Sequence, residues 1–246
     1  MNEISGLEIL NNLRALGVKP GMMLEVHCAL SAFGHVSGGA DTVIDALMMA
    51  VGGEGAIVMP AFCLSPDVPL TEEDKAMGLV KKIRILPPEE KRTAMGLVAD
   101  TFRQRHDVIT GDGMFRVAAW GKDASIHAKG FGHIIDHGGY ALLLGVDIYR
   151  LSAMHYVEDI LPQVIRDRFQ PPKEAWAIYP QNEWFVEAWE SSVKPWYKIQ
   201  KMAYEKGLIA DSMIGGAKCM LMEVKPVITL YRQALETNPT GLYGLT

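Results

Sequence analysis

The stretch MLEVHCALSAFGHVSGGADTVIDALMMAVGGEGAIVMPAF, residues 23–62, decides the fold. Residues 23–27 and 56–59 are short apolar runs of the kind that forms buried strands, and Pro60 closes the second run. Between them, apolar residues recur at helical spacing over residues 40–51, and a Gly-Gly pair follows. A strand, a helix and a second strand in this order predict a parallel α/β sheet.

The same reasoning extends outward along the chain. Further helices are expected at residues 3–17, 93–105, 152–161 and 225–236, and further strands at residues 141–146 and 217–224. Residues 64–91 are rich in proline and acidic residues, and we expect an extended excursion over the sheet with one short helix, either a surface loop or a lid. Residues 171–198 carry four tryptophans and four prolines, and their pattern assigns no structure.

Composition and charge argue against several classes of protein. The chain has 246 residues, 49% of them hydrophobic, which is enough to bury a core. Its net charge of -5 argues against a nucleic-acid partner, which requires a basic face. Cys28, Cys63 and Cys219 lie far apart and lack the spacing of a zinc site or a disulfide framework. Without a signal-peptide pattern or an 18-residue apolar run, we expect a cytoplasmic protein with no membrane partner and no metal.

The loop at residues 28–39 is a candidate anion site. It follows the first strand and ends in Gly38-Gly39, directly before a helix. The N–H groups at a helix N-terminus attract anions, and glycine lets a ligand approach the backbone closely. The glycines match neither a dinucleotide fingerprint nor a P-loop. The alternative is that this glycine pair is an ordinary turn.

His155 and Glu158 form a candidate catalytic pair beyond the strand at residues 141–146. Residues three apart lie on one face of a helix, so the carboxylate can orient the imidazole and support its cation. Acyl transfer to an amine requires such a base, because an alkylammonium cannot attack before it loses a proton. The alternative is a solvated ion pair on a helix surface.

Taken together, these motifs resemble the aminoglycoside 3-N-acetyltransferase family in their order along most of the chain. The match is close over VHCALSAFGHVSGGADTVIDALMMAVGGEGAIVMPAF, residues 26–62. Further matches are MGLVADTFR at residues 95–103, AAWG at 118–121, LLLGV with the later H-x-x-E at 142–158, and Gly-Gly-Ala at 215–217. The resemblance implies one domain over residues 1–246, an α/β/α sandwich with a central mixed, largely parallel sheet.

It also implies acetyl-CoA and a small-molecule amine as the two substrates, and a role in antibiotic resistance. The residues that would bind acetyl-CoA are Cys28, Ala29, Leu30, Ser31, Val36, Ser37, Gly38, Gly39 and Thr110. His155 would be the general base, and Glu158 its partner or an acceptor-binding carboxylate. Asp112 and Asp147 are further candidates for the acceptor site. Backbone N–H groups of residues 28–31 are candidates to stabilise the oxyanion of the thioester carbonyl.

The chain departs from the family in one region. The usual Arg-Ser-x-His-Pro-x-x-Ser reads ITGDGMFR at residues 109–116, a usual aspartate is Tyr149, and a usual serine is Cys28. Two other functions therefore stay open. One is a relative that binds coenzyme A without catalysis, and the other is a hydrolase with Cys28 as nucleophile and His27 or His155 as base. A homodimer is also compatible with the sequence.

Overall fold

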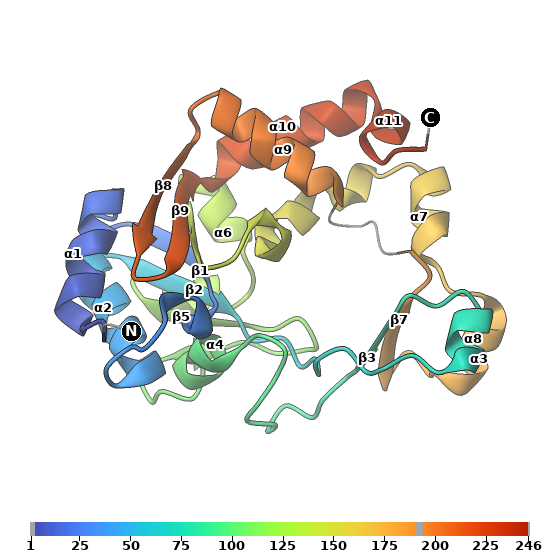
Figure 1. Ribbon diagram of the computed structural model, residues 1–246, viewed down its shortest axis with the longest axis horizontal. Coiled ribbons are helices and arrows are strands. Elements are labelled where there is room, and N and C mark those ends of the chain that lie inside the picture. Colours follow the sequence, from blue (N-terminus) through green and yellow to red (C-terminus); the bar gives the residue numbers. More distant parts are fainter. Residues whose placement is uncertain (1–2, 190–193, 246) are drawn as a thin grey trace.

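A computed structural model describes residues 3–189 and 194–245, and a seven-stranded sheet lies at its centre (Figure 1). The strands are β1 (Met23–Cys28), β2 (Ala56–Pro60), β4 (Ile109–Thr110), β5 (Val117–Gly121), β6 (Tyr140–Leu144), β8 (Ile209–Ile214) and β9 (Ala217–Glu223). Their order across the sheet is β4-β5-β2-β1-β6-β9-β8. The stretch at residues 23–62 therefore supplies the central strand, its neighbour β2 and the connecting helix α2 (Gly39–Val51).

The sheet is mixed, but it is not largely parallel. β1 is parallel to β2 and to β6, as the strand–helix–strand order predicted. The pairs β2–β5, β4–β5, β6–β9 and β8–β9 are antiparallel. The expectation of a largely parallel sheet is therefore wrong. One reason is visible in the chain, since only Gly215-Gly216 separates β8 from β9, and a two-residue turn can join only antiparallel strands.

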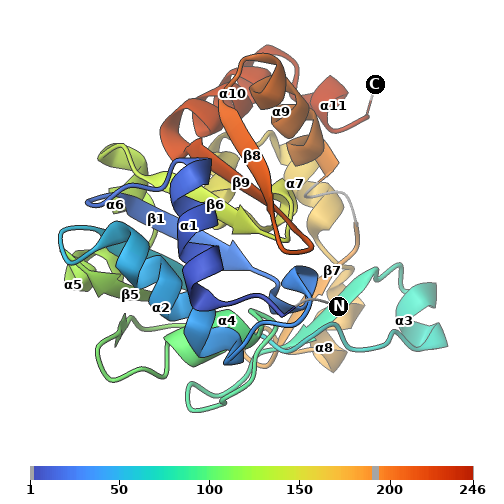
Figure 2. The same ribbon diagram turned by 60° about the vertical axis from the view of Figure 1, so that its left-hand side comes forward.

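Helices cover both faces of the sheet, which confirms the α/β/α sandwich. One face packs on α1 (Gly6–Leu16), α2 and α4 (Leu97–Phe102), and Figure 2 shows α1 and α2 in front of the strands. The other face packs on α6 (Gly132–Asp136), the 3₁₀ helix η3 (Ser152–Ile160), α9 (Lys194–Glu205) and α10 (Val224–Thr237). Side chains alternate along a strand, so Leu24 and Val26 of β1 face the first layer and Glu25 and His27 face the second.

The first and last predicted helices are confirmed. Ser5 caps α1, because its hydroxyl accepts a hydrogen bond from Glu8 N–H (3.3 Å) while the Glu8 carboxylate accepts one from Ser5 N–H (2.8 Å). Gly17 ends this helix with φ +118°. Helix α10 carries Pro226 in its first turn, where a missing N–H is tolerated.

Two predicted helices differ from the structure. The helix expected at residues 93–105 is limited to α4, because Asp100 accepts hydrogen bonds from Thr93 N–H and Thr93 Oγ1, both at 2.8 Å. These bonds hold the residues before α4 in a loop, and Gly96 has φ +92°. The helix at residues 152–161 is the 3₁₀ helix η3.

Two segments without a predicted strand form a second, smaller unit, which we call the arm. It contains α3 (Glu72–Ala76), β3 (Lys81–Arg84), α8 (Lys173–Ile178) and β7 (Trp184–Glu187). β3 and β7 pair antiparallel in a sheet of their own. Figure 1 shows the arm beside the main sheet, at the right of the view. The short helix expected within residues 64–91 is confirmed, but their expected position over the sheet is wrong.

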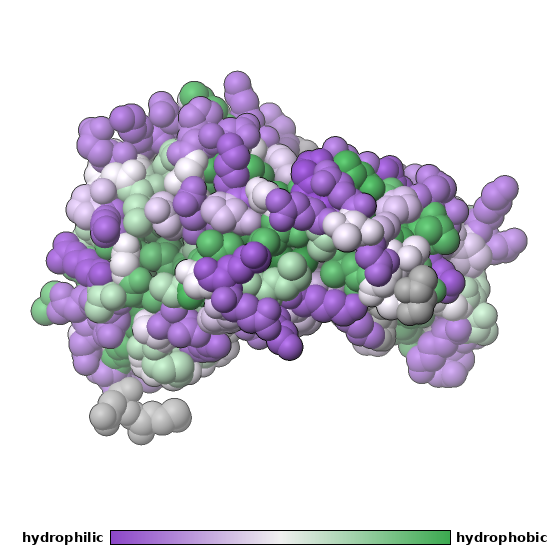
Figure 3. Space-filling view, turned by 90° about the horizontal axis from the view of Figure 1, so that it is seen from above, coloured by the Kyte–Doolittle hydropathy of each residue, from purple (hydrophilic) through white to green (hydrophobic). Residues whose placement is uncertain are grey.

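The remaining described elements connect these parts. They are α5 (Ala124–His127), α7 (Gln163–Phe169), α11 (Pro239–Leu242), and the 3₁₀ helices η1 (Leu30–Phe33) and η2 (Ile148–Arg150). Viewed from above, the surface carries hydrophilic side chains at both ends and shows apolar ones in its middle (Figure 3). Across residues 3–189 and 194–245, every helix is too short or too polar to cross a membrane.

Candidate active site

The structure brings His155 and Glu158 together on η3. A 3₁₀ helix has three residues per turn, so residues three apart lie directly above one another. Nδ1 of His155 lies 2.7 Å from Oε2 of Glu158. The His155 side chain is 55% exposed and the Glu158 side chain 26%. The pair is therefore reachable from solvent, as a catalytic base requires.

The surroundings of η3 restrict the imidazole. Met154 and Val157 on the same helix are buried and pack in the apolar cluster on this face of the sheet. Phe131 N–H donates a hydrogen bond to the Tyr156 hydroxyl (2.9 Å), which ties η3 to the start of α6. The His155 ring meets the buried Trp196 of α9 edge to face, with ring centroids 4.9 Å apart. The imidazole of His155 is therefore contacted by the Glu158 carboxylate at Nδ1 and by the Trp196 indole on one side.

Glu187 joins this pair from the arm. Burial raises the pKa of Glu187, and the carboxylates of Glu158 and Asp67 add to the increase, while Lys81 and His155 oppose it. Glu187 Oε2 lies 3.8 Å from Lys81 Nζ. The charges of His155 and Glu158 on η3 therefore reach the Glu187 carboxyl of the arm. Sequence reasoning missed Glu187 because residues 171–198 showed no periodicity, and only the pairing of β7 with β3 places it.

The loop after β1 is more ordered than the sequence indicated. Residues 30–33 form η1, and Ala29 N–H donates to Leu144 O (2.9 Å). That N–H group is therefore not available for an oxyanion, whereas the N–H groups of Leu30 and Ser31 open the first turn of η1. The Val36 side chain is buried in the core, so it can contribute only backbone atoms to a ligand site.

The glycine pair before α2 has backbone conformations suited to its position. Gly38 and Gly39 have φ +75° and +64°, in the left-handed region. A Cβ on Gly38 would lie 2.4 Å from Thr42 Oγ1, so a larger residue cannot stand there without a shift. No side chain caps this helix among the described residues. Gly39 N–H donates to Val36 O (3.0 Å), so the N–H groups of Ala40 and Asp41 are the ones open to an anion.

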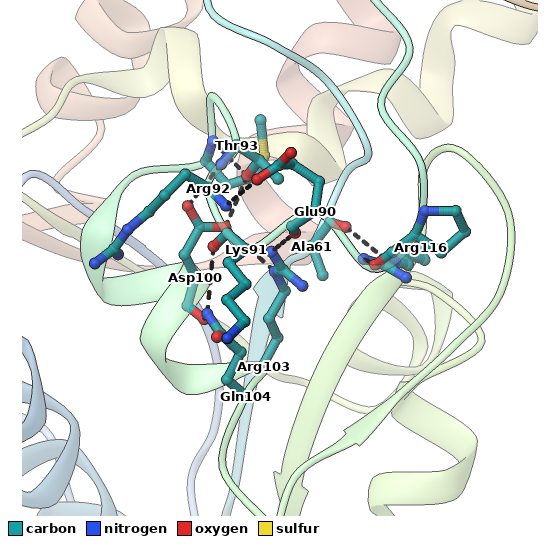
Figure 4. Close-up of polar contacts among 11 residues, drawn as sticks. Ala61, Glu90, Lys91, Arg92, Thr93, Asp100, Arg103, Gln104 and Arg116 are labelled. Carbon is teal, nitrogen blue, oxygen red and sulfur yellow. Dashed lines mark hydrogen bonds and ion pairs between the residues drawn. The ribbon is translucent and has the colours of Figure 1, made fainter.

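Residues 90–93 form a loop beside Asp100, Arg103 and Gln104 (Figure 4). Arg103 holds this loop by donating to Glu90 O and to Asp100 Oδ1, and Arg116 donates to Ala61 O (3.0 Å). The loop and its neighbours line a surface pocket of about 320 Å³, formed by Asp41, Lys91, Arg92, Thr101, Gln104 and Arg105. Arg105 pairs with Asp41, Asp45 and Asp107, so Lys91 and Arg92 are the cations of this pocket that suit a phosphorylated ligand.

Three other candidates lie apart from His155. The Thr110 hydroxyl is buried and has no hydrogen-bond partner within the described ranges. Asp112 is exposed in the turn between β4 and β5. Asp147 directly precedes η2. The pKa of Tyr197 on α9 is raised, chiefly by burial and next by the charge of Asp147. In residues 3–189 and 194–245, no hydrogen bond or ion pair joins Asp112 or Asp147 to His155.

Cys28 lies in a poor environment for a nucleophile. Burial, with a smaller contribution from Cys219, raises the pKa of the Cys28 thiol well above its usual range. The thiolate is the reactive form, so this thiol stays protonated and inert at neutral pH.

Comparison with known proteins decides the family. A model described as aminoglycoside 3-N-acetyltransferase matches residues 26–236. The chain belongs to this family. It is 28% identical over 247 residues to the SPbeta prophage-derived aminoglycoside N(3')-acetyltransferase-like protein YokD of Bacillus subtilis, covering 89% of this chain and 88% of YokD. The resemblance stated from the motifs is thereby confirmed.

Solved structures share the fold of this aminoglycoside 3-N-acetyltransferase family member. The apoenzyme of aminoglycoside acetyltransferase AAC(3)-IVa superposes with a TM-score of 0.73 at 20% identity, covering 99% of this chain and 92% of that one. AAC-IIIb, solved as a binary complex with CoASH, superposes with a TM-score of 0.70 at 18% identity, covering 96% and 98%. The chain is thus an acyltransferase of a family that uses acetyl-CoA as its cosubstrate.

Proposed function

We propose that this protein transfers the acetyl group of acetyl-CoA directly to an amine, with His155 as general base. The contact between His155 Nδ1 and Glu158 Oε2 supports this role. A carboxylate at Nδ1 favours the tautomer that carries its proton there, which leaves Nε2 free to accept a proton. The acceptor ammonium gives that proton to Nε2, and the neutral amine then attacks the thioester carbonyl. The C–S bond breaks, and the departing coenzyme A thiolate takes up the proton that the new amide nitrogen loses.

The acceptor is proposed to be an aminoglycoside or a related polyamine. Glu158 contacts His155, and the charges of Glu158 and Asp67 both act on Glu187, so several cationic groups on one ligand can pair with these carboxylates. The family description points to the same class of substrate. Asp112 and Asp147 remain predicted acceptor contacts, because no contact of the structure tests them.

The donor is proposed to lie along the loop after β1 and the start of α2. Acetyl-CoA supplies the thioester and carries phosphates, and the uncapped N-terminus of α2 with Lys91 and Arg92 suits those phosphates. The N–H groups of Leu30 and Ser31 are proposed to stabilise the oxyanion, since Ala29 N–H is already bonded. The unpaired Thr110 hydroxyl can donate to a polar group of the donor.

The measurement that tests this proposal is release of the CoA thiol from acetyl-CoA with a panel of aminoglycosides and simpler amines. Loss of the base in His155→Ala is expected to lower kcat by about 10²–10⁴-fold while acetyl-CoA still binds. His137→Ala removes an exposed histidine directly after α6 and is expected to keep full activity. Equal rates for His155→Ala and the wild type would refute the role of His155.

A coenzyme A-binding relative without catalysis is the alternative, motivated by the altered residues 109–116. It predicts measurable acetyl-CoA binding and no thiol release with any amine of the panel. A single domain over residues 1–246, a cytoplasmic location and a homodimer stay predictions beside the proposed activity. Size-exclusion chromatography with light scattering would decide the oligomeric state.

A further inference from the structure

A buried carboxylate and a buried histidine lie side by side in the middle of the central strand. Glu25 is fully buried and His27 is 7% exposed. Both point from β1 toward the layer that carries η3. The cross-strand partners of Glu25 are Val58 and Ala141, which are apolar and fully buried. A charged side chain in such a place is costly unless specific partners compensate it.

The partners of this pair lead to η3. Glu25 Oε1 lies 2.8 Å from His27 Nε2 and accepts a hydrogen bond from Ala153 N–H (3.1 Å). Ser152 N lies 3.4 Å from His27 Nε2. The shorter of the two Nε2 contacts assigns this nitrogen as a donor to Glu25. Glu25 therefore accepts from the Ala153 N–H group of the helix that carries His155, while His27 holds the Glu25 carboxylate and lies beside the Ser152 N–H group.

These N–H groups need a partner from outside the helix. The first N–H groups of a helix have no acceptor within it, and the N-cap residue of η3 is Leu151, whose side chain cannot accept a hydrogen bond. Glu25 replaces the missing cap from another element, and its negative charge suits the positive end of the helix. An apolar residue at position 25 would pack among its neighbours but would leave the start of η3 unanchored.

We infer that Glu25 and His27 are positioning residues that fix the N-terminus of η3 and thereby hold His155 in reach of the acceptor amine. This inference rests on the proposed role of His155. The anchored residue Ala153 is two residues from His155, about 4 Å along a 3₁₀ helix, so a shift at the anchor moves the imidazole directly. A misplacement of about 1 Å is enough to slow catalysis by about 10²-fold.

The test compares Glu25→Leu with Glu25→Gln and with Ile44→Ala. Leucine removes the acceptor, whereas glutamine keeps an oxygen for Ala153 N–H. Ile44→Ala opens a cavity on the opposite face of the sheet and serves as a control for stability alone. Two quantities are measured: kcat and KM for both substrates, and hydrogen exchange of peptides covering residues 148–160.

Glu25→Leu is expected to lower kcat about tenfold or more with little change in KM for acetyl-CoA, and to speed exchange in residues 148–160. Glu25→Gln is expected to restore most of kcat. Ile44→Ala is expected to lower Tm and to leave kcat and this exchange unchanged. An unchanged kcat in Glu25→Leu, or equal losses of kcat in Glu25→Leu and Ile44→Ala, would overturn the inference.

Two further results keep the test decisive. If Glu25→Leu does not fold, His27→Leu takes its place, because it removes the donor that holds the Glu25 carboxylate against Ala153 N–H. A fall in kcat at constant KM supports the inference, and an unchanged kcat overturns it. If the wild type shows no thiol release with any amine, the proposed function fails. Exchange in residues 148–160 then still decides whether Glu25 anchors η3.

Discussion

Different interactions stabilise the main sheet and the arm. The main sheet lies between two large apolar clusters, and its helices cover both faces. The arm has only a small apolar cluster, whose buried members are Leu79, Ala175 and Val186. Beside this cluster it buries a polar group in which Asp74 accepts hydrogen bonds from Lys82 Nζ and from the Tyr179 hydroxyl, each at 2.5 Å.

This difference teaches how the proposed active site is divided. The main sheet is a rigid frame that carries His155, Glu158 and the loop after β1. The arm contributes Glu187, and its geometry depends on one buried ion pair rather than on a broad core. An ion pair of this kind is costly to break by removing one partner, because the other charge stays buried without compensation. We therefore expect the arm to respond to single polar substitutions far more than the frame does.

The strongest test of this contrast is Lys82→Met, which leaves Asp74 buried and unpaired. We expect the arm to lose about 3–5 kcal/mol of local stability, while the frame stays folded. Hydrogen exchange should accelerate in peptides of residues 68–86 and 172–187 and stay unchanged in residues 23–62. Leu47→Ala in the frame is the counterpart, and it should destabilise the whole molecule by about 2–5 kcal/mol. Exchange that rises equally everywhere in Lys82→Met would show that arm and frame unfold as one unit.

Removing the charge of Glu187 should weaken binding of the acceptor amine rather than binding of acetyl-CoA. Glu187→Gln is expected to raise KM for a polycationic amine about tenfold, with little change in KM for acetyl-CoA. Glu174→Gln, on the exposed side of α8 in the same arm, is the matched control and should behave like the wild type. Steady-state kinetics with both substrates varied would check this, and an unchanged acceptor KM would remove Glu187 from the acceptor site.

Acceptor binding should also depend on pH through Glu187. Burial raises the pKa of this carboxyl, so it takes up a proton at a higher pH than an exposed glutamate does. A protonated Glu187 no longer attracts a cation, and the acceptor KM should therefore rise as the pH falls toward the acid range. Glu187→Gln should flatten this part of the profile. Identical profiles for the two proteins would contradict the assignment.

The arm should also lose stability in acid. Burial alone would raise the pKa of Asp74, but hydrogen bonds from Lys82 and Tyr179 outweigh it and lower the pKa to about 2. A lowered pKa in the folded state stabilises the fold above the ordinary value of 3.8, and this contribution is lost as the pH falls from 3.8 to about 2. Tryptophan fluorescence of Trp184, beside Tyr179, would follow the transition. Asp74→Asn should remove this pH dependence.

The smallest effect is expected at Cys28. Cys28→Ser should keep kcat within about twofold, because a half-buried thiol with a raised pKa takes no part in the proposed direct transfer. Mass spectrometry after incubation with acetyl-CoA alone should find no acetyl group on Cys28. An acylated Cys28 together with an inactive Cys28→Ser protein would instead support the hydrolase reading.

Residues 23–62 and the ends of the chain could be predicted because their apolar residues repeat at the period of the element they form. The His155–Glu158 contact was equally readable, since residues three apart meet on an α-helix and on a 3₁₀ helix alike. Residues 171–198 were not readable, because β7 is a four-residue strand whose partner lies about a hundred residues earlier. Glu187 was missed for the same reason.

The sequence by itself determined the strand–helix–strand centre, the histidine–glutamate pair and the membership of a family, because each depends on residues close together in the chain. Only the tertiary structure decided the directions of β5 against β2 and of β9 against β6, the existence of the arm and the burial of Glu25 beneath η3. These depend on contacts between segments far apart in the sequence, such as Glu25 with Ala153 and Lys82 with Tyr179. A local pattern records which residues prefer to be buried, but only packing decides which buried groups meet.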